Sequence, residues 1–154
     1  MKTIKRIVVG IDFSTYAQRI MEYGAGIAER NMAELIAVNV INKRQIDYIK
    51  TVCKDEAPNV FSLSKFINDE TARRTHKLDD LIRHCVSTKV STRPVIMIGV
   101  PFEEILNVVD NEHADIVVIS SKGRSNFQDY IFGTTSEKIF RHCPVPVLSL
   151  NLRT

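Results

Sequence analysis

The fold is indicated most clearly by residues 115–137, which read DIVVISSKGRSNFQDYIFGTTSE. The four apolar residues of 116–119 are typical of a short strand that is buried on both faces of a parallel sheet. Small, polar and cationic residues follow, and Gly123 among them permits a tight turn. Thr134, with Glu137 three residues later, matches a capping box and predicts that a helix begins there.

The turn between this strand and this helix has two interpretations. A helix N-terminus presents free N–H groups and partial positive charge, so a phosphate there would meet backbone donors and the hydroxyls of Thr134 and Thr135. Alternatively, the residues are polar only because an ordinary connection on the surface is solvated. The residue types alone leave both interpretations open.

Length and composition favour one globular domain over residues 1–154. Hydrophobic residues make up 44% of the chain and charged residues 25%, unlike a disordered or membrane protein. No apolar run is long enough to span a membrane, and the run after the basic residues 1–6 is too short for the core of a signal peptide. We therefore expect a cytoplasmic protein with no membrane partner.

Charge and cysteine content exclude further classes. The net charge is +3 with dispersed cations, so nothing indicates a nucleic-acid partner. Cys53, Cys85 and Cys143 form no C-x-x-C pair and are expected to be reduced thiols. The four histidines lack the spacing of metal ligands, and we expect no metal site built from side chains.

The remaining elements follow from the apolar runs. Further strands are predicted at residues 5–11, 34–41, 95–98 and 145–150, and the third is expected to be buried. Helices are predicted at about 15–30, 62–88, after Pro101, and at 135–142. Residues 42–61 are expected to form a partly helical excursion that either covers a ligand or is a plain surface insertion.

Two conclusions follow from this order of elements. Five strands alternating with four helices predict an open, doubly wound α/β fold. The charged residues of the second helix, which include Arg73 and Arg74, are expected to form a solvated face.

Asp12 is the clearest candidate for a ligand-binding side chain. Ligands of open parallel sheets bind beyond the carboxyl ends of the strands, so a carboxylate after the first strand can reach a ribose hydroxyl or a metal. The structural alternative is that Asp12 or Ser14 caps the next helix. The chain contains neither G-x-G-x-x-G after the first strand nor G-x-x-x-x-G-K-[ST], so a nucleotide must be held in another way.

Several stretches together resemble the universal stress protein family over nearly the whole chain. The resemblance is carried by IVVGIDFS at the start, by VNVI, GVPFEEIL and ADIVVI, and by SEKIFRHCPVPVL at the end. The family's nucleotide motif is glycine, two residues, glycine, nine residues, then glycine with serine or threonine. Its second and third glycines fall on Gly123 and Gly133, with Thr134 beside the latter, but the first falls on Ser120.

This resemblance implies a five-stranded parallel sheet in the order 3-2-1-4-5, with helices on both faces and a cleft at the carboxyl ends of strands one and four. Asp12 would hold the ribose, and backbone near Ile11 and Val40 would flank adenine. The phosphates would be surrounded by Ser120, Gly123, Arg124, Gly133, Thr134 and Thr135. The cofactor would be ATP with Mg²⁺, or AMP or ADP.

The sequence therefore predicts an ATP-binding stress-response regulator, with a protein partner that is unknown. We also expect a homodimer through the edge strand 145–150, although the prolines at 144 and 146 can instead blunt that edge. The alternative is a signalling or interaction module of the same fold that has lost ATP binding, because some family members lack the motif.

Two further expectations concern the strength of binding and the chemistry. We expect Ser120 to weaken ATP binding without abolishing it, because a serine at this place either strains the turn or adds a Cβ near the phosphates. We assign no catalytic residue and expect any ATP hydrolysis to be slow, since no group is placed to orient a water.

Overall fold

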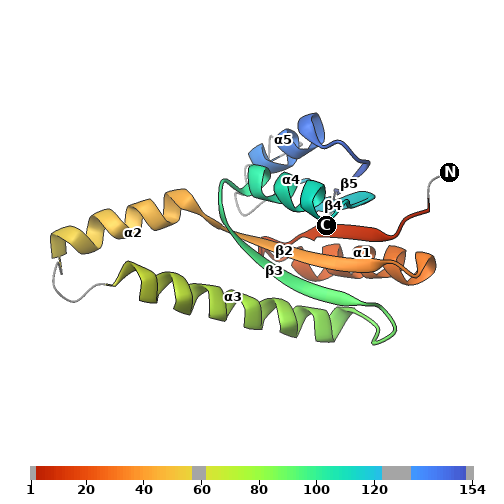
Figure 1. Ribbon diagram of the computed structural model, residues 1–154, viewed down its shortest axis with the longest axis horizontal. Helices are drawn as coiled ribbons and strands as arrows, with labels where there is room; N and C mark the ends of the chain where they lie inside the picture. Colours follow the sequence, from red (N-terminus) through yellow and green to blue (C-terminus); the bar gives the residue numbers. More distant parts are fainter. Residues whose placement is uncertain (1–2, 57–61, 123–132, 152–154) are drawn as a thin grey trace.

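Five parallel strands form one sheet in the order β3-β2-β1-β4-β5 (Figure 1). The computed structural model describes residues 3–56, 62–122 and 133–151. The strands are β1 Arg6–Gly10, β2 Glu34–Asn42, β3 Thr92–Gly99, β4 Ile116–Ser120 and β5 Val147–Leu150. β2 and β3 are added on one side of β1, and β4 and β5 on the other, as in doubly wound folds. The predicted fold and strand order are therefore both confirmed.

Helices cover both faces of the sheet (Figure 1). One face carries α1 Ala17–Asn31 and α3 Leu63–Cys85, and the other carries α4 Pro101–Asn111 and α5 Thr134–His142. The side chains of β1 alternate between them, because Ile7 and Val9 pack in the core beneath α1 whereas Val8 packs with α4 and α5. All three are fully buried, which explains why the strand is a continuous apolar run.

The excursion that we expected after the second strand is a regular helix. β2 leads directly into α2 Lys43–Glu56, and α2 and the first half of α3 extend past the end of the sheet as an arm (Figure 1). Ile46 of α2 is 7% exposed, so the helix has a buried side despite its many charges. Residues 57–61 of the predicted excursion lie outside the described residues.

The two edge strands differ from their predicted forms. β3 is longer than predicted, and it is not buried, because it forms one edge of the sheet and Ile98 is 44% exposed. Pro94 lies within it, which an edge strand tolerates since one side of its backbone needs no partner. The opposite edge, β5, begins only at Val147, after both prolines.

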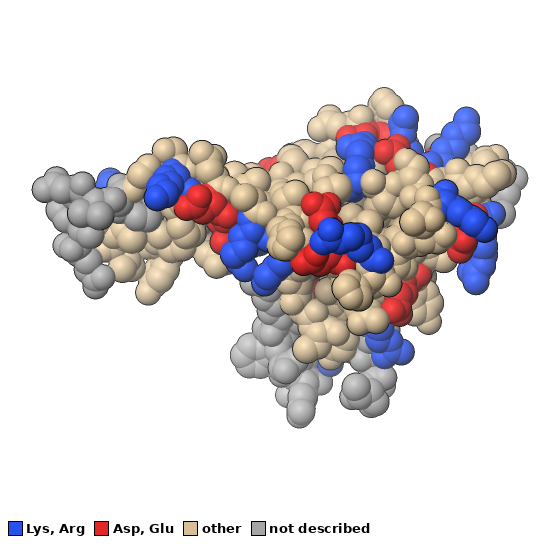
Figure 2. All heavy atoms as spheres, turned by 90° about the horizontal axis from the view of Figure 1, so that it is seen from below, with Lys and Arg blue, Asp and Glu red and all other residues tan. Residues whose placement is uncertain are grey.

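Charges of both signs are interspersed on the side of the molecule that carries α3 (Figure 2). Two pairs along that helix illustrate this: Arg83 pairs with Asp80, and Arg73 pairs with Glu70 at 2.6 Å. Within the described residues, each helix is too short or too polar to cross a membrane.

Two glycines of α1 provide a matched test of how closely the helix packs on β1. A Cβ on Gly24 would lie 2.5 Å from Cγ2 of Val9, whereas a Cβ on Gly26 would meet nothing within 4 Å. Gly24→Ala should lower the free energy of unfolding by about 1–3 kcal/mol through overpacking. Gly26→Ala should raise it by about 0.5–1 kcal/mol through helix propensity.

Urea denaturation of both variants and the parent protein measures the two effects. If Gly24→Ala were as stable as Gly26→Ala, the close approach of α1 to β1 would be wrong.

Candidate functional site

A cavity of about 360 Å³ lies at the carboxyl ends of the central strands. Its walls come from the end of β1 and Asp12, from the ends of β2 and β4, and from the first turn of α5. Because β1 lies between β2 and β4 in the sheet, the β2 and β4 residues lie on opposite sides of Asp12. A second hollow of about 1020 Å³ lies at the amino ends of the strands, and none of the seven described site residues lines it.

The cavity brings together most of the predicted site residues. Seven of the nine line it: Ile11, Asp12, Val40, Ser120, Gly133, Thr134 and Thr135. The other two, Gly123 and Arg124, lie outside the described residues. Residues that are far apart in sequence therefore converge as expected from the order of the strands.

Asp12 belongs to a turn and does not cap the following helix. Its Oδ1 accepts a hydrogen bond from the Ser14 backbone N–H at 2.9 Å, and Oγ of Ser14 accepts from the Tyr16 N–H at 3.3 Å. The helix begins at Ala17, and its cap residue, Tyr16, makes no capping hydrogen bond with its side chain. The cap residue is Tyr16 and not Asp12 or Ser14, although the Ser14 hydroxyl accepts a backbone N–H in the turn that leads into α1. The same turn holds Asp12 at the cavity wall.

The backbone beside Asp12 is strained. Phe13 has a φ of 56°, a conformation that bulky side chains rarely adopt. Such strain persists where the surrounding structure imposes it, and it is common at ligand-binding turns.

The first turn of α5 is not closed by a capping box. The cap residue is Gly133, so Thr134 is already inside the helix, and among the described residues no side chain caps the helix start. Glu137 instead pairs with Arg141 at 2.8 Å. The predicted capping box is therefore wrong, and the first turn of α5 keeps its backbone donors at the wall that Thr134 and Thr135 line.

Hydrogen bonds connect the end of β4 to the start of α5. Oγ of Ser136 donates to the carbonyl of Ser120 at 2.6 Å, and the N–H of Gly133 donates to the carbonyl of Ser121 at 2.7 Å. Ser120 itself is not among the described residues with positive φ, so a serine there carries no left-handed strain. Of the two effects considered for Ser120, only the added Cβ remains.

Buried polar side chains gather at this cavity. Among the described residues four such side chains are buried: Asn39, Arg74, Ser121 and Ser136. Three of them line the cavity, and Ser121 follows Ser120 at its wall. Buried polar groups are costly unless paired, so their concentration here indicates a functional role.

Arg74 is the residue that the sequence interpretation placed wrongly. It was expected on a solvated face, but it is only 3% exposed. Its Nε donates to Oε1 of Glu70 at 2.7 Å, and Nη1 donates to Oδ1 of Asn39 at 2.9 Å and to the carbonyl of Val40 at 3.2 Å. Nη2 donates to Oε1 of Gln45 at 3.2 Å.

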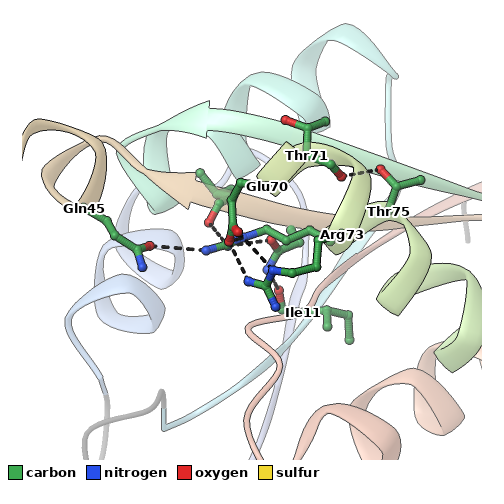
Figure 3. Close-up of polar contacts among 9 residues, drawn as sticks. Ile11, Gln45, Glu70, Thr71, Arg73 and Thr75 are labelled. Atoms are coloured by element: carbon green, nitrogen blue, oxygen red, sulfur yellow. Dashed lines mark hydrogen bonds and ion pairs between the residues drawn. The ribbon is translucent and has the colours of Figure 1, made fainter. Parts of the chain in front are cut away.

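The network reaches across three elements of the fold. Figure 3 shows Gln45 and Glu70 on different helices, with dashed lines that meet at the guanidinium between them. Asn39 of β2 in turn donates from Nδ2 to the carbonyl of Ile11 at 2.7 Å. The ends of β1 and β2, the start of α2 and the middle of α3 are thus joined at one side of the cavity.

Only one of these residues gave a signal in the sequence. Asn39 is the single polar residue in the apolar run of β2, and a polar residue there requires a partner. Arg74, Gln45 and Ser136 are ordinary helix residues whose role depends on which element lies opposite.

Hydrogen bonds from Arg73 and then Arg74 lower the pKa of Glu70 from its ordinary value of 4.5 to about 2, against the opposing effect of burial. The bond to Arg74 is screened only weakly, because the Glu70 side chain is 15% exposed and that of Arg74 4%, whereas the Arg73 side chain is 53% exposed and its bond is screened more. The carboxylate therefore stays charged and paired through the neutral and mildly acidic range.

This lowered pKa predicts a specific acid sensitivity. A depressed pKa contributes stability above the ordinary value of 4.5, and the contribution is lost as the pH falls toward 2. The full contribution is roughly 3 kcal/mol by linkage. Glu70→Gln should therefore unfold more easily at pH 7, and its free energy of unfolding should depend less on pH between 5 and 2.

Urea denaturation across this pH range tests the prediction. The matched control is Glu137→Gln, because the Glu137 side chain is 50% exposed in its pair with Arg141 and should contribute less than about 1 kcal/mol. Equal pH dependence in Glu70→Gln and the parent would show that Glu70 has an ordinary pKa.

Comparisons with known proteins give relatives of similar length. The chain is 24% identical over 150 residues to universal stress protein MJ0577 of Methanocaldococcus jannaschii, covering 94% of this chain and 93% of the relative. It is 25% identical over 150 residues to a universal stress protein of Mycobacterium tuberculosis, with coverage of 96% and 97%.

Solved structures have the same fold. The structure of hypothetical protein MJ0577 matches with a TM-score of 0.83 at 21% identity, covering 99% of both chains. A universal stress protein in complex with cAMP matches with a TM-score of 0.67 at 18% identity, covering 97% and 98%. One from Archaeoglobus fulgidus in complex with dAMP matches with a TM-score of 0.63 at 16% identity, covering 96% and 98%.

The family itself is shown by a match along almost the whole sequence. The model of the "Universal stress protein family" matches residues 3–150, which include all five strands. The chain therefore belongs to the universal stress protein family.

Proposed function

We propose that this protein is a cytoplasmic stress-response regulator that binds an adenine nucleotide, ATP in particular, in the cavity at the carboxyl ends of the strands. The observation that carries the proposal is the order of groups along the cavity. Asp12 lies between the end of β2 on one side and the end of β4 with the first turn of α5 on the other. Two solved relatives in the comparison contain cAMP and dAMP.

The spacing of the strands suits a base, a sugar and phosphates in that order. Neighbouring strands are about 4.8 Å apart, so β2 and β4 are separated by about 10 Å. The base would lie by Ile11 and Val40, the ribose hydroxyls would bond to Asp12, and the phosphates would lie by α5. A carboxylate is a strong acceptor for two neighbouring hydroxyls, as in other doubly wound nucleotide sites.

The phosphate end supplies donors and positive charge. No side chain in the described part of the chain caps the first turn of α5, and Lys122, Thr134 and Thr135 line the same wall. Gly123 and Arg124, which the family motif adds to this end, remain predictions.

Mg²⁺ would be held mainly by the nucleotide itself. The described part of the chain contains no group of three or more His, Cys, Asp or Glu that could hold a metal. Mg²⁺ commonly keeps several waters and binds through substrate phosphates, so a site of this kind needs no such group of side chains.

The proposed role is binding, with at most slow hydrolysis of ATP. Among the described residues that line the cavity, Asp12 is the single carboxylate, and none is a histidine or cysteine. Asp12 lies at the proposed ribose position, away from the end where a terminal phosphate would be attacked. Groups that only hold phosphates stabilise ground state and transition state alike.

Isothermal titration with ATP and Mg²⁺ tests this function. We expect ATP to bind and GTP to bind more weakly. Asp12→Ala should weaken ATP binding by about 10- to 100-fold, because hydrogen bonds to a charged group are each worth about 1.5–3 kcal/mol. Asp110→Ala, at an exposed position on α4, is the matched control and should bind ATP like the parent.

The absence of both heat and thermal stabilisation at millimolar ATP would contradict nucleotide binding. It would favour the alternative of a signalling or interaction module that has lost this ligand.

We also propose that the protein is a homodimer that pairs through β5. The strand forms one edge of the sheet, and both prolines precede it and do not interrupt it. Phe140, on the helix before it, is 62% exposed, so apolar surface is available near this edge. An edge strand of this kind pairs readily with a second copy.

The hydrogen-bonding pattern identifies a substitution that separates pairing from folding. The carbonyls of Pro146 and Leu150 accept from β4, so the alternate residue Ser149 directs its backbone away from β4, toward the free edge. Ser149→Pro should therefore remove a donor for the second copy while leaving the bonds to β4. Within the described part of the chain, the Ser149 hydroxyl is buried without a partner, so Ser149→Ala is a mild control.

Sedimentation equilibrium should give about twice the chain mass of 17.5 kDa for the parent and for Ser149→Ala. Ser149→Pro should sediment as a single chain. A parent protein that is monomeric at micromolar concentration would contradict the dimer.

A further inference from the structure

Arg74 is the buried charged side chain among the described residues, and neither the ribose nor the phosphate end of the cavity uses it. A buried charge is costly unless it is well paired. Its place is at the end of the cavity formed by β2, α2 and α3, where the base of the nucleotide would lie. The burial of this charge at the cavity therefore indicates a role in binding as well as in folding.

The guanidinium is held in a fixed orientation without any ligand. A guanidinium has five N–H groups, and acceptors on Glu70, Asn39, Val40 and Gln45 take four of them. These acceptors come from α3, β2 and α2, so the group cannot turn without breaking bonds to several elements. A donor fixed in this way loses little entropy when it binds a ligand.

One N–H of Arg74 is left for a ligand. Nη2 donates one of its two hydrogens to Gln45, and within the described residues the other has no acceptor. Arg74 is one of the residues that line the cavity, so this second N–H is a side-chain donor beside that wall. The Val40 N–H, on the same side of β2 as the Val40 carbonyl, is a backbone donor there.

The carbonyl beside this donor also faces the cavity. The Val38 carbonyl accepts from the Ile11 N–H at 2.8 Å, which shows that alternate residues of β2 direct their backbone toward β1. Val40 therefore faces the same way, beyond the point where β1 has ended. Its carbonyl accepts from Nη1 of Arg74 at 3.2 Å and has a second lone pair.

An acceptor and a donor side by side match adenine better than guanine. Adenine offers an amine donor with a ring nitrogen acceptor on either side of it, whereas guanine has an oxygen acceptor in place of the amine. Guanine would place this oxygen against the Val40 carbonyl, which is also an acceptor.

We propose that Arg74 is a specificity-determining residue that donates from Nη2 to a ring nitrogen of adenine, N1 or N7, while the Val40 carbonyl accepts from the adenine amine. This inference rests on the proposed nucleotide function and assigns the base recognition to a side chain outside the glycine motif. The remaining bonds of Arg74 position the donor.

Titration of the unmodified protein with ATP, 1-deaza-ATP and 7-deaza-ATP tests the inference directly. Each analogue replaces one ring nitrogen by a C–H group that cannot accept. We expect one of the two analogues to bind at least about tenfold more weakly than ATP, a change equivalent to about 1.4 kcal/mol. If ATP binds and both analogues bind as tightly as ATP, the proposed contact is absent.

A variant then shows whether Arg74 is the donor. Arg74→Lys keeps a charge but loses the planar group, and it should bind ATP about tenfold more weakly without distinguishing ATP from the sensitive analogue. Arg83→Lys is the matched control, because it makes the same change at an exposed position of α3, and it should bind ATP like the parent and still distinguish the two ligands.

The outcomes separate the possible failures. If Arg74→Lys loses affinity for ATP and for the sensitive analogue by the same factor, Arg74 only maintains the structure of the site and does not contact the base. The inference would then be wrong. If Arg74→Lys does not fold in a thermal unfolding test, equal affinity of the unmodified protein for ATP and both analogues still contradicts the inference. If that protein binds none of the three nucleotides, the proposed function itself fails.

Discussion

The cavity exists because β1 is shorter than its neighbour β2. β1 buries side chains on both faces, and its last residue, Gly10, pairs with Val38, whereas β2 continues to Asn42. Beyond Gly10 the backbone of β2 loses most of its partner strand on that side, and buried backbone groups must be bonded elsewhere. Asn39 and Arg74 supply part of that bonding, and the space left by β1 is the cavity.

The lack of a partner strand for the end of β2 also links the cavity to the arm formed by α2 and α3. Arg74 can be buried only with a carboxylate beside it, which Glu70 supplies one turn earlier on α3, and its remaining bonds reach Gln45 at the start of α2. Removing any one partner leaves a buried charge partly unsatisfied, so the two helices and the strand are energetically coupled. A ligand that contacts Arg74 would therefore also affect the positions of α2 and α3.

The sequence predicts features that follow from local pattern and fails where a distant element decides. The apolar runs of β1, β2 and β4 predicted buried parallel strands, because their burial is uniform along each strand. The run of β3 looks alike, but its place at the edge depends on the strand order. Arg74 has the local pattern of a solvated residue, and only the end of β2 lying opposite makes it buried.

The serine at the start of the glycine motif bears on whether the site is retained. Ser120 has no left-handed backbone to strain, and its Oγ accepts from the Lys122 N–H at 3.3 Å, which stabilises the turn. Its carbonyl accepts from Ser136, so it also helps to fix the start of α5. A residue with these contacts orders the end of the cavity where we propose that the phosphates bind, so the serine is compatible with the proposed site. The cost that remains is the space taken by one Cβ, and a neighbouring phosphate can move to accommodate it.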